Sequence, residues 1–268
     1  MSIKHRLLVG IIREYIKSRE PIGSEFLKSQ QNLDISSATI RNYCKILESE
    51  GALFQPHTSS GRIPTRHSLS SYWRETLRSF VEEELEIDMG RMPRLSRDYE
   101  IFCVAIPRER NLLEEVMQMH EIYLIFKFSR GELVTPFSEA LFRFSRGLIG
   151  LEIQELIKVA GDVGAMELRE KLLCLRQFDF NITSYRYGSE FIQETLSGDG
   201  EVFMDFYNAY ALLKYGNGIY FNILPQGYLT IIHDISYLDR KKQKSRARML
   251  CAGSLMVDYK NFYRELCV

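Results

Sequence analysis

SSATIRNYCKILESEG, at residues 36–51, has the pattern of a short amphipathic helix. Two serines precede it and a glycine ends it. Serine can cap the N-terminus of a helix, and glycine commonly follows the C-terminus. At about 100° per residue, the apolar residues fall on one side of the helix, which we expect to pack on the preceding chain. These residues are Ile40, Tyr43, Cys44 and Leu47.

The opposite side of this helix is polar, with one small residue, Ala38, set among the polar ones. An arginine can bind guanine or a phosphate, an asparagine can pair with adenine, and a lysine can neutralise a phosphate. A small alanine lets a helix lie deep in a groove and contact a thymine methyl group. The pattern predicts a DNA-recognition helix, and a solvated face on an ordinary surface helix is the alternative. The candidate base or phosphate contacts are Ala38, Arg41, Asn42 and Lys45, and the candidate phosphate contacts at the helix start are Ser36, Ser37 and Thr39.

Two more helices are predicted before this one. Apolar residues recur at helical spacing from about residue 3 to residue 18, and Pro21 and Gly23 then interrupt the chain. A second short helix is predicted over SEFLKSQQ, and NLDI forms the turn that leads to Ser36. Three short helices with a tight turn between the second and the third describe a helix-turn-helix.

A β-hairpin is predicted directly after the third helix. Residues 53–54 have the pattern of a short strand, residues 56–61 that of a turn, and residues 62–63 that of a return strand that Pro64 ends. A hairpin beside a recognition helix forms a wing, and short donors at its tip suit the DNA backbone or minor groove. For the histidine, a turn residue with no special role is the alternative. The candidate contacts are His57, Thr58, Ser59, Ser60 and Arg62.

The motifs EPIGSEFL, ISSATIRN and QPHTSSGRIPT resemble the winged-helix domain of the HrcA family, the bacterial heat-inducible transcription repressors. The resemblance covers about residues 3–73, and this order of motifs is far more specific than a generic helix-turn-helix pattern. It implies a homodimer that binds double-stranded DNA at an inverted-repeat operator upstream of chaperone operons. It further implies that a GroEL-type chaperonin promotes the DNA-binding form, and that the rest of the chain is a GAF-like domain interrupted by an inserted dimerisation segment.

The expected fold class is therefore α+β, with a winged helix-turn-helix domain over residues 1–75 and a GAF-like domain over residues 98–268. A helix over residues 68–86 leads out of the hairpin, and residues 76–97 are expected to connect the two domains. The inserted segment is expected at about residues 147–205. Strand patterns occur at 101–106, 122–128, 219–224, 228–238 and 249–257, and helix patterns at 150–162, 167–175, 189–196 and 204–216.

Charge is unevenly distributed along the chain. Residues 1–78 hold 12 Lys/Arg and 7 Asp/Glu, a net charge of +5, whereas residues 79–268 hold 23 and 28, a net charge of −5. A basic N-terminal part on an acidic remainder suggests a polyanion-binding module joined to a different module. The basic run at 239–248 is either a solvated hairpin loop or a second contact with DNA, acidic lipid or a partner.

Several classes of protein are disfavoured by what the sequence lacks. It has no membrane-length apolar run and no signal-peptide cleavage region, so we expect a cytoplasmic protein. The five cysteines are far apart and have no zinc-ligand spacing, which favours reduced thiols and no metal. No catalytic or phosphate-loop motif occurs, so we expect neither an enzyme nor a cofactor. Two alternatives stay open: a winged-helix repressor that a small molecule controls through the C-terminal domain, and a binder of RNA or single-stranded DNA.

Overall fold

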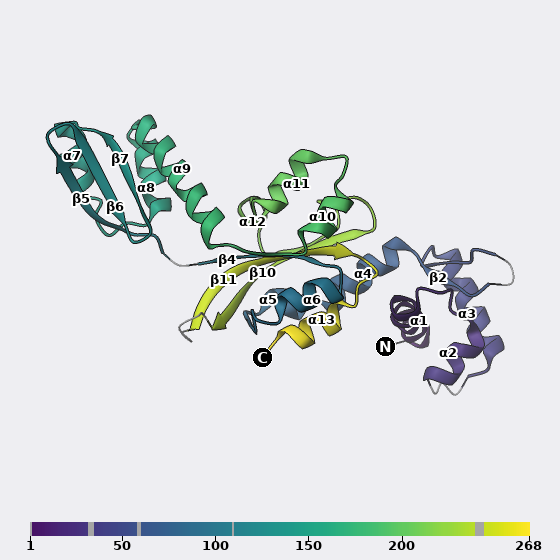
Figure 1. The fold of residues 1–268 in the computed structure, drawn as a ribbon. Helices are drawn as coiled ribbons and strands as arrows, with labels where there is room; N and C mark the ends of the chain where they lie inside the picture. The colour runs from purple at the N-terminus through teal and green to yellow at the C-terminus, as the bar shows by residue number, and fades with distance from the viewer. Residues whose placement is uncertain (1, 32–34, 58–59, 109, 239–243) are drawn as a thin grey trace.

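The computed structural model describes residues 2–31, 35–57, 60–108, 110–238 and 244–268. Figure 1 shows an elongated molecule in three parts. A helical N-terminal unit lies at one end, a central sheet with helices on both faces lies in the middle, and a smaller unit of strands and helices lies at the other end. The N-terminal and the smaller unit each have a core of their own, and the central part has one on each face of its sheet.

The N-terminal unit contains three helices and a two-stranded hairpin, as the sequence predicts. The helix expected over residues 3–18 is confirmed, and most of the expected NLDI turn lies outside the described residues. Apolar side chains from all three helices and from the first strand share one core. The elements are α1 (Ile3–Ser18), α2 (Ser24–Gln31), α3 (Ser37–Ser49), β1 (Leu53–Phe54) and β2 (Ile63–Pro64).

The chain that follows the hairpin is not the single helix expected over residues 68–86. It divides at Leu77, whose side chain is fully buried, and its last residues form a strand that pairs in parallel with the central sheet. Residues 76–97, expected as a connector, pack into the central core, because tertiary burial outweighs helix propensity in short segments. The elements here are α4 (Arg66–Thr76), α5 (Arg78–Glu82), β3 (Leu85–Ile87) and α6 (Met92–Asp98).

The central sheet has the strand order β3-β10-β11-β4-β8, and β9 pairs with β10 beside β3. A long antiparallel hairpin, β10 with β11, forms its middle. The second strand of this hairpin begins at Lys244, within the basic run at 239–248, whose first five residues lie outside the described part of the chain. The strands not yet given are β4 (Phe102–Pro107), β8 (Tyr185–Tyr187), β9 (Gly218–Tyr220), β10 (Tyr228–Leu238) and β11 (Lys244–Ser254).

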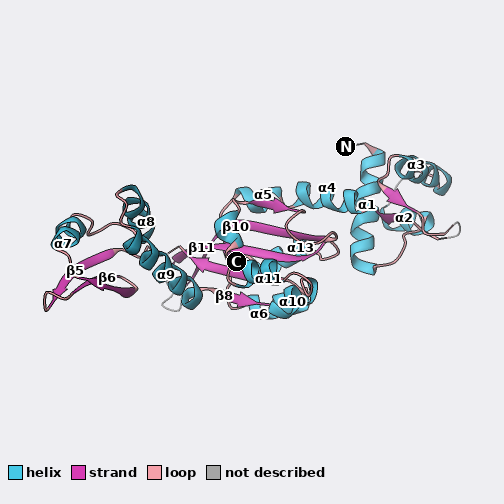
Figure 2. Ribbon diagram, turned by 90° about the horizontal axis from the view of Figure 1, so that it is seen from above, coloured by secondary structure: helices cyan, strands magenta, loops and turns pink. Residues whose placement is uncertain are grey.

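Helices cover both faces of the central sheet (Figure 2). Strand β10 is therefore buried along nearly its whole length, with Ile231 in the core on one face and Ile232 in the core on the other. This mixed α+β arrangement is consistent with the GAF-like domain that the family resemblance implies. One face carries α5, α6 and α13 (Tyr259–Leu266), and the other carries α10 (Ser189–Thr195), α11 (Gly200–Tyr207) and α12 (Ala211–Lys214).

A separate unit is inserted in the chain between β4 and β8. Its three-stranded sheet packs against its helices around Leu124, Phe126 and Leu156. The sequence places the inserted segment at about 147–205, whereas the core of this unit starts at Leu113, and α10 and α11 pack on the central sheet instead. The elements of the inserted unit are β5 (Leu113–Met119), β6 (Tyr123–Phe128), β7 (Gly131–Pro136), α7 (Glu139–Arg146), α8 (Ile153–Asp162) and α9 (Met166–Thr183).

Three general features complete the description of the fold. All five cysteines are free thiols, of which Cys44, Cys103 and Cys251 are buried. Within the described residues, no cluster of histidine, cysteine and acidic side chains is suited to hold a metal ion. None of the helices described is both long and apolar enough to cross a membrane.

Candidate nucleic-acid interface

Helix α3 has the predicted capped start and the predicted apolar side. The Ser36 hydroxyl accepts a hydrogen bond from the Thr39 backbone N–H at 3.1 Å and lies 2.9 Å from the Thr39 hydroxyl. This cap satisfies one of the free N–H groups at the helix start. The apolar side is confirmed, because Ile40, Cys44 and Leu47 are buried and Tyr43 packs partly buried on the same core.

The opposite side of α3 is exposed along its length. Within the described residues, neither Asn42 nor Lys45 is held by a hydrogen bond or an ion pair, so both side chains are available to a ligand. At the start of the helix, Ser36 is also exposed to solvent, and Ser37 is half-buried. The exposed residues of the polar side are Ala38, Thr39, Arg41, Asn42 and Lys45.

Within the described residues, Arg41 is paired with Glu25 of the neighbouring helix. Its Nη2 lies 3.6 Å from Glu25 Oε1 in the first turn of α2, and the two side chains are 57% and 74% exposed. An ion pair this exposed is worth little, so a phosphate or a base can replace the carboxylate at small cost. The Arg41 guanidinium thus stays available to a ligand despite its ion pair with Glu25.

The hairpin tip is closed by hydrogen bonds between His57 and Ser60. The backbone N–H of Ser60 donates to His57 O at 2.9 Å, and its hydroxyl accepts from His57 N at 3.0 Å. The His57 side chain is exposed and free to contact a ligand, whereas Ser60 is half-buried and serves the turn. Thr58 and Ser59 lie outside the described residues.

Arg62 points back at the protein rather than out from the hairpin. Its Nε donates to Glu48 Oε1 of α3 at 2.7 Å, and only 11% of its side chain is exposed. A charge-assisted bond in this setting fixes the hairpin against the helix. Sequence reasoning grouped Arg62 with the tip residues because it could not see this partner.

Gly61 is a structural residue that sequence reasoning treated only as part of a turn. A Cβ atom at this position would lie 2.5 Å from the backbone carbon of Ile22 and 2.6 Å from that of Pro21. Ile22 and Arg62 exchange two backbone hydrogen bonds of 2.9 Å at this crossing. The EPIG segment and the Gly-Arg pair of the hairpin are therefore one contact, and the glycine is what permits it.

Thr65 fixes the other end of the hairpin. Its hydroxyl donates to Gly51 O at 2.9 Å, and its side chain caps the start of α4. Gly51 ends α3 with a positive φ of 71°, which glycine adopts without strain. Thr65, the last residue of the hairpin motif, thus stabilises the junction of α3, the hairpin and α4 and is not itself a proposed DNA contact.

A basic three-helix unit with an open polar helix face, joined to a larger α+β part, is typical of a transcription regulator. Comparison with known proteins agrees with this class. The model of the HrcA C-terminal domain matches residues 73–267, and the chain belongs to the HrcA family.

Curated relatives support the same conclusion over nearly the whole chain. The heat-inducible transcription repressor HrcA of Helicobacter pylori strain J99 is 28% identical over 266 residues, which cover 99% of this chain and 95% of that protein. The protein of the same name from Thermotoga neapolitana is 33% identical over 144 residues, covering 46% and 42%. By family, the chain is a heat-shock transcriptional repressor, and this family is not a class of enzymes.

A solved structure shares the fold. It is a crystal structure described as that of a hypothetical protein, with a TM-score of 0.51 and 22% sequence identity. The similarity covers 98% of this chain and 93% of the other. The overall fold of the chain therefore occurs in an experimentally determined structure.

Proposed function

We propose that this protein represses heat-shock chaperone operons as a homodimer that binds an inverted-repeat operator. Residues 1–75 act as a winged helix-turn-helix, and α3 of each subunit enters the major groove. The observation that supports this most is the exposed face of α3, with Arg41, Asn42 and Lys45 around the small Ala38. Repression is steric, because an occupied operator blocks the polymerase, and the protein acts in the cytoplasm.

The proposed roles of the interface residues follow from their chemistry. Arg41 and Asn42 read base edges, Lys45 neutralises a phosphate, and Ala38 lets the helix approach the bases. The remaining candidates contact the DNA backbone or the minor groove, except that Arg62 positions the hairpin through Glu48. These backbone or minor-groove contacts are Ser36, Ser37, Thr39, His57, Thr58, Ser59 and Ser60.

The inserted unit offers a surface for the dimer. The strand register puts one set of side chains on the face of its sheet away from Leu124 and Phe126. Three of them are strongly exposed for apolar residues: Met119 at 47%, Tyr123 at 47% and Val134 at 50%. Exposed apolar faces of this kind favour an isologous contact with a second copy. We place the dimerisation segment at residues 110–184. The apolar residues on this face are Met117, Met119, Tyr123, Ile125, Val134 and Pro136, and the same register puts the charged Glu115, Lys127 and Glu132 on it toward the other end of the strands.

Sedimentation of a charged variant tests this dimer. Val134→Glu puts a carboxylate on the outer face of the sheet, and Val163→Glu is the control, because Val163 is 56% exposed in the same unit but follows α8. We expect V134E to sediment as a monomer at concentrations where the parent and V163E are dimers. A V134E dimer as tight as the parent would place the interface elsewhere.

The operator proposal is tested by gel-shift titration of the full chain on a duplex with the heat-shock inverted repeat and on a scrambled duplex. If each subunit neutralises about four phosphates, the slope of log affinity against log salt is about −7. Added GroEL-type chaperonin is expected to raise the active fraction, a partner that the family resemblance alone suggests. Binding that is weak and equal on both duplexes would mean that the helix reads another target.

The ligand-sensing alternative has one observation in its favour. A cavity lies between the central sheet and the inserted unit, and arginines dominate its wall, where an aromatic lining was expected of a sensor pocket. Operator binding that ignores the chaperonin but responds to a small molecule would support this alternative.

A further inference from the structure

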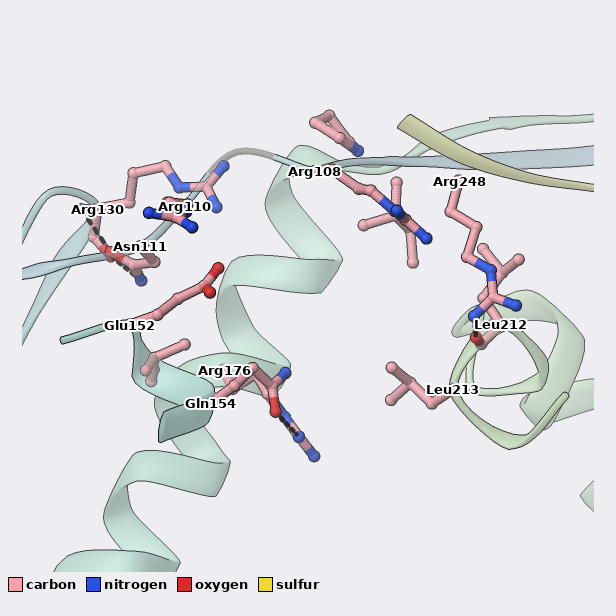
Figure 3. Close-up of a pocket in the computed structure, with 13 residues that line it drawn as sticks. Arg108, Arg110, Asn111, Arg130, Glu152, Gln154, Arg176, Leu212, Leu213 and Arg248 are labelled. Atoms are coloured by element: carbon pink, nitrogen blue, oxygen red, sulfur yellow. Dashed lines mark hydrogen bonds between the residues drawn. The ribbon is translucent and has the colours of Figure 1, made fainter. Parts of the chain in front are cut away.

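The cavity at the junction of the central sheet and the inserted unit has a volume of about 390 Å³ (Figure 3). The central part contributes the end of β4 with the residue after it, the middle of α12 and one residue of β11. The inserted unit contributes the chain before β5, the loop between β6 and β7, the start of α8 and one residue of α9. A ligand of small-metabolite size fits a cavity of this volume.

The wall of this cavity is strongly basic. Five of its residues are arginines, and one, Glu152, is acidic, which leaves four positive charges in excess among the described lining residues. Like charges gathered in a concave, partly desolvated site repel one another, and an anion removes that repulsion. The five are Arg108, Arg110, Arg130, Arg176 and Arg248, and Figure 3 shows that they come from both sides of the cavity.

Among the described residues, the carboxylate of Asp234, which is not part of the lining, offsets part of this charge at Arg108 and Arg248. Arg108 pairs with Asp234 at 2.8 Å. Arg248, however, donates to the neutral carbonyl oxygens of Leu212 at 2.6 Å and Tyr215 at 2.8 Å. Arg176 donates to the amide oxygen of Gln154 at 2.9 Å. These neutral acceptors orient the guanidinium groups and leave their charge available to a bound anion.

Glu152 is engaged in its own helix. Its carboxylate accepts from the backbone of the first turn of α8, while Glu155 accepts from the Glu152 backbone N–H at 2.9 Å. Asn111 is also committed, since its side chain makes hydrogen bonds of 2.9 and 3.1 Å with the backbone of Arg130. Glu152 thus lies at the start of α8 with its carboxylate reaching toward the cavity (Figure 3), and the loop that carries Arg130 is fixed in place.

Burial affects the charge of two of these arginines. Desolvation lowers the pKa of both the Arg176 and the Arg248 guanidinium from the usual value, which reflects the cost of keeping these charges out of water. Both groups remain charged at neutral pH, because an arginine pKa lies far above it. A bound anion offsets this cost.

We propose that this cavity binds a small phosphorylated anion, of a size up to a nucleotide, that bridges the central sheet and the inserted unit. Guanidinium groups bind phosphate oxygens through paired N–H donors, and they do so better than other cations. Leu212 and Leu213 provide an apolar wall for an uncharged part of the ligand. The site is independent of the operator-binding face, because none of its residues belongs to the N-terminal unit.

A bridging anion has a consequence that rests on the proposed dimer. In the described part of the chain, the connections between the central part and the inserted unit follow β4 and precede β8. A ligand held by arginines on both sides restricts the relative orientation of these two parts. If the inserted unit forms the dimer contact, the ligand thereby sets the spacing of the two DNA-binding units.

Isothermal titration calorimetry of the full chain with orthophosphate, pyrophosphate and ADP tests the site. Arg110→Gln and Arg176→Gln each remove one cavity cation, and Arg110 is exposed, so its replacement leaves the fold intact. Arg143→Gln is the matched control, because Arg143 is on α7 of the same unit and 78% exposed. Arg41→Gln removes a cation of the proposed DNA face.

We expect pyrophosphate to bind the parent, R143Q and R41Q with equal affinity, and to bind R110Q and R176Q at least about tenfold more weakly. ADP that binds tighter than pyrophosphate indicates that the leucine wall contacts a nucleoside. Equal binding of the two, or binding of orthophosphate alone, indicates that only the phosphate is recognised. The proposed site would be wrong if none of the probes released or absorbed heat on titration. It would also be wrong if R41Q lost affinity for pyrophosphate while R110Q and R176Q kept it. Operator binding of the same variants is measured separately. This second measurement shows whether the anion site, the proposed repressor function, or both are wrong.

Discussion

The indole Nε1 of Trp73 donates a hydrogen bond to the carbonyl oxygen of Leu255 across 2.8 Å in the central core. Trp73 is on α4, is fully buried and has the ring of Tyr259 edge-on at 5.3 Å. Ile12 and Ile16 of α1 belong to the same core. The N-terminal unit is therefore docked on the central part through a packed contact.

Replacing this tryptophan tests the docking. Trp73→Phe keeps an aromatic ring but leaves the buried oxygen of Leu255 without its donor, a loss of about 1–3 kcal/mol in the free energy of unfolding. Tyr72→Phe, on the neighbouring ring, is the control and should change stability little. Urea unfolding measures both, and a W73F protein as stable as the parent would show that the hydrogen bond does not hold the two parts together.

Gly61 is expected to be intolerant of any side chain. Gly61→Ala would place a Cβ atom 2.5 Å from a backbone carbon, which cannot move without disrupting the crossing between Ile22 and Arg62. We expect a loss of about 1–3 kcal/mol in stability, as for other overpacked sites, together with weaker operator binding. Gly23→Ala is the matched control, since nothing lies within 4 Å of a Cβ there. Thermal unfolding of the two variants decides the matter, and equal midpoints would refute the close contact.

Glu25 is expected to weaken DNA binding in the parent. Its carboxylate lies 3.6 Å from Arg41 and adds a negative charge beside the proposed DNA face. Glu25→Gln removes both the competing partner and the repulsion from phosphate, so we expect operator affinity to rise about three- to tenfold at low salt. Glu82→Gln, which breaks an exposed pair with Arg78, is the control. Fluorescence anisotropy titrations measure the change, and unaltered or reduced affinity in E25Q would contradict it.

His233 gives the fold a dependence on pH. It is fully buried on β10, with Nε2 2.9 Å from the Tyr263 hydroxyl and Nδ1 3.2 Å from Asp234 O, and burial lowers its pKa to about 4. The unfolded chain binds a proton at this histidine near its ordinary pKa of 6.5, well before the folded chain does. Its contribution to stability is therefore complete above pH 6.5 and is lost as the pH falls toward 4.

We expect the parent to lose about 2 kcal/mol more than His233→Gln in free energy of unfolding between pH 7 and pH 5. Glutamine cannot take up a proton, so the free energy of unfolding of the H233Q variant lacks this dependence on pH. His120→Gln, at an exposed turn residue, is the control and should follow the parent. Urea unfolding at the two pH values gives the comparison, and parallel losses in the parent and H233Q would exclude His233 as the cause.

Sequence reasoning succeeded where the signal is local. The helical periodicity of residues 36–51 is enough to separate the buried Ile40 from the exposed Arg41, since both follow from the helix alone. It missed β5 and β7, because Glu114 and Glu115 break the strand pattern of β5, and β7 begins with Gly131 and ends with Pro136, which are typical of turns. The inserted unit was placed too late in the chain for this reason.

Contacts between distant parts of the chain cannot be predicted from local sequence periodicity. Gly61 and Pro21 are adjacent in space because the hairpin folds back on the turn before α2. The arginines of the cavity are scattered from residue 108 to residue 248, and only the fold gathers them. Arg62 was assigned to DNA contact on its type, whereas its environment is set by Glu48.

The central claim is that α3 reads DNA, and the most direct test is an anisotropy titration of Arg41→Ala on an inverted-repeat operator and on a scrambled duplex. Arg143→Ala, on the inserted unit, is the control. We expect R41A to lose about 1–3 kcal/mol of operator binding, roughly tenfold to a hundredfold in affinity, with its fold intact by circular dichroism. A folded R41A protein that binds the operator as tightly as the parent and R143A would contradict the assignment of α3 as the recognition helix.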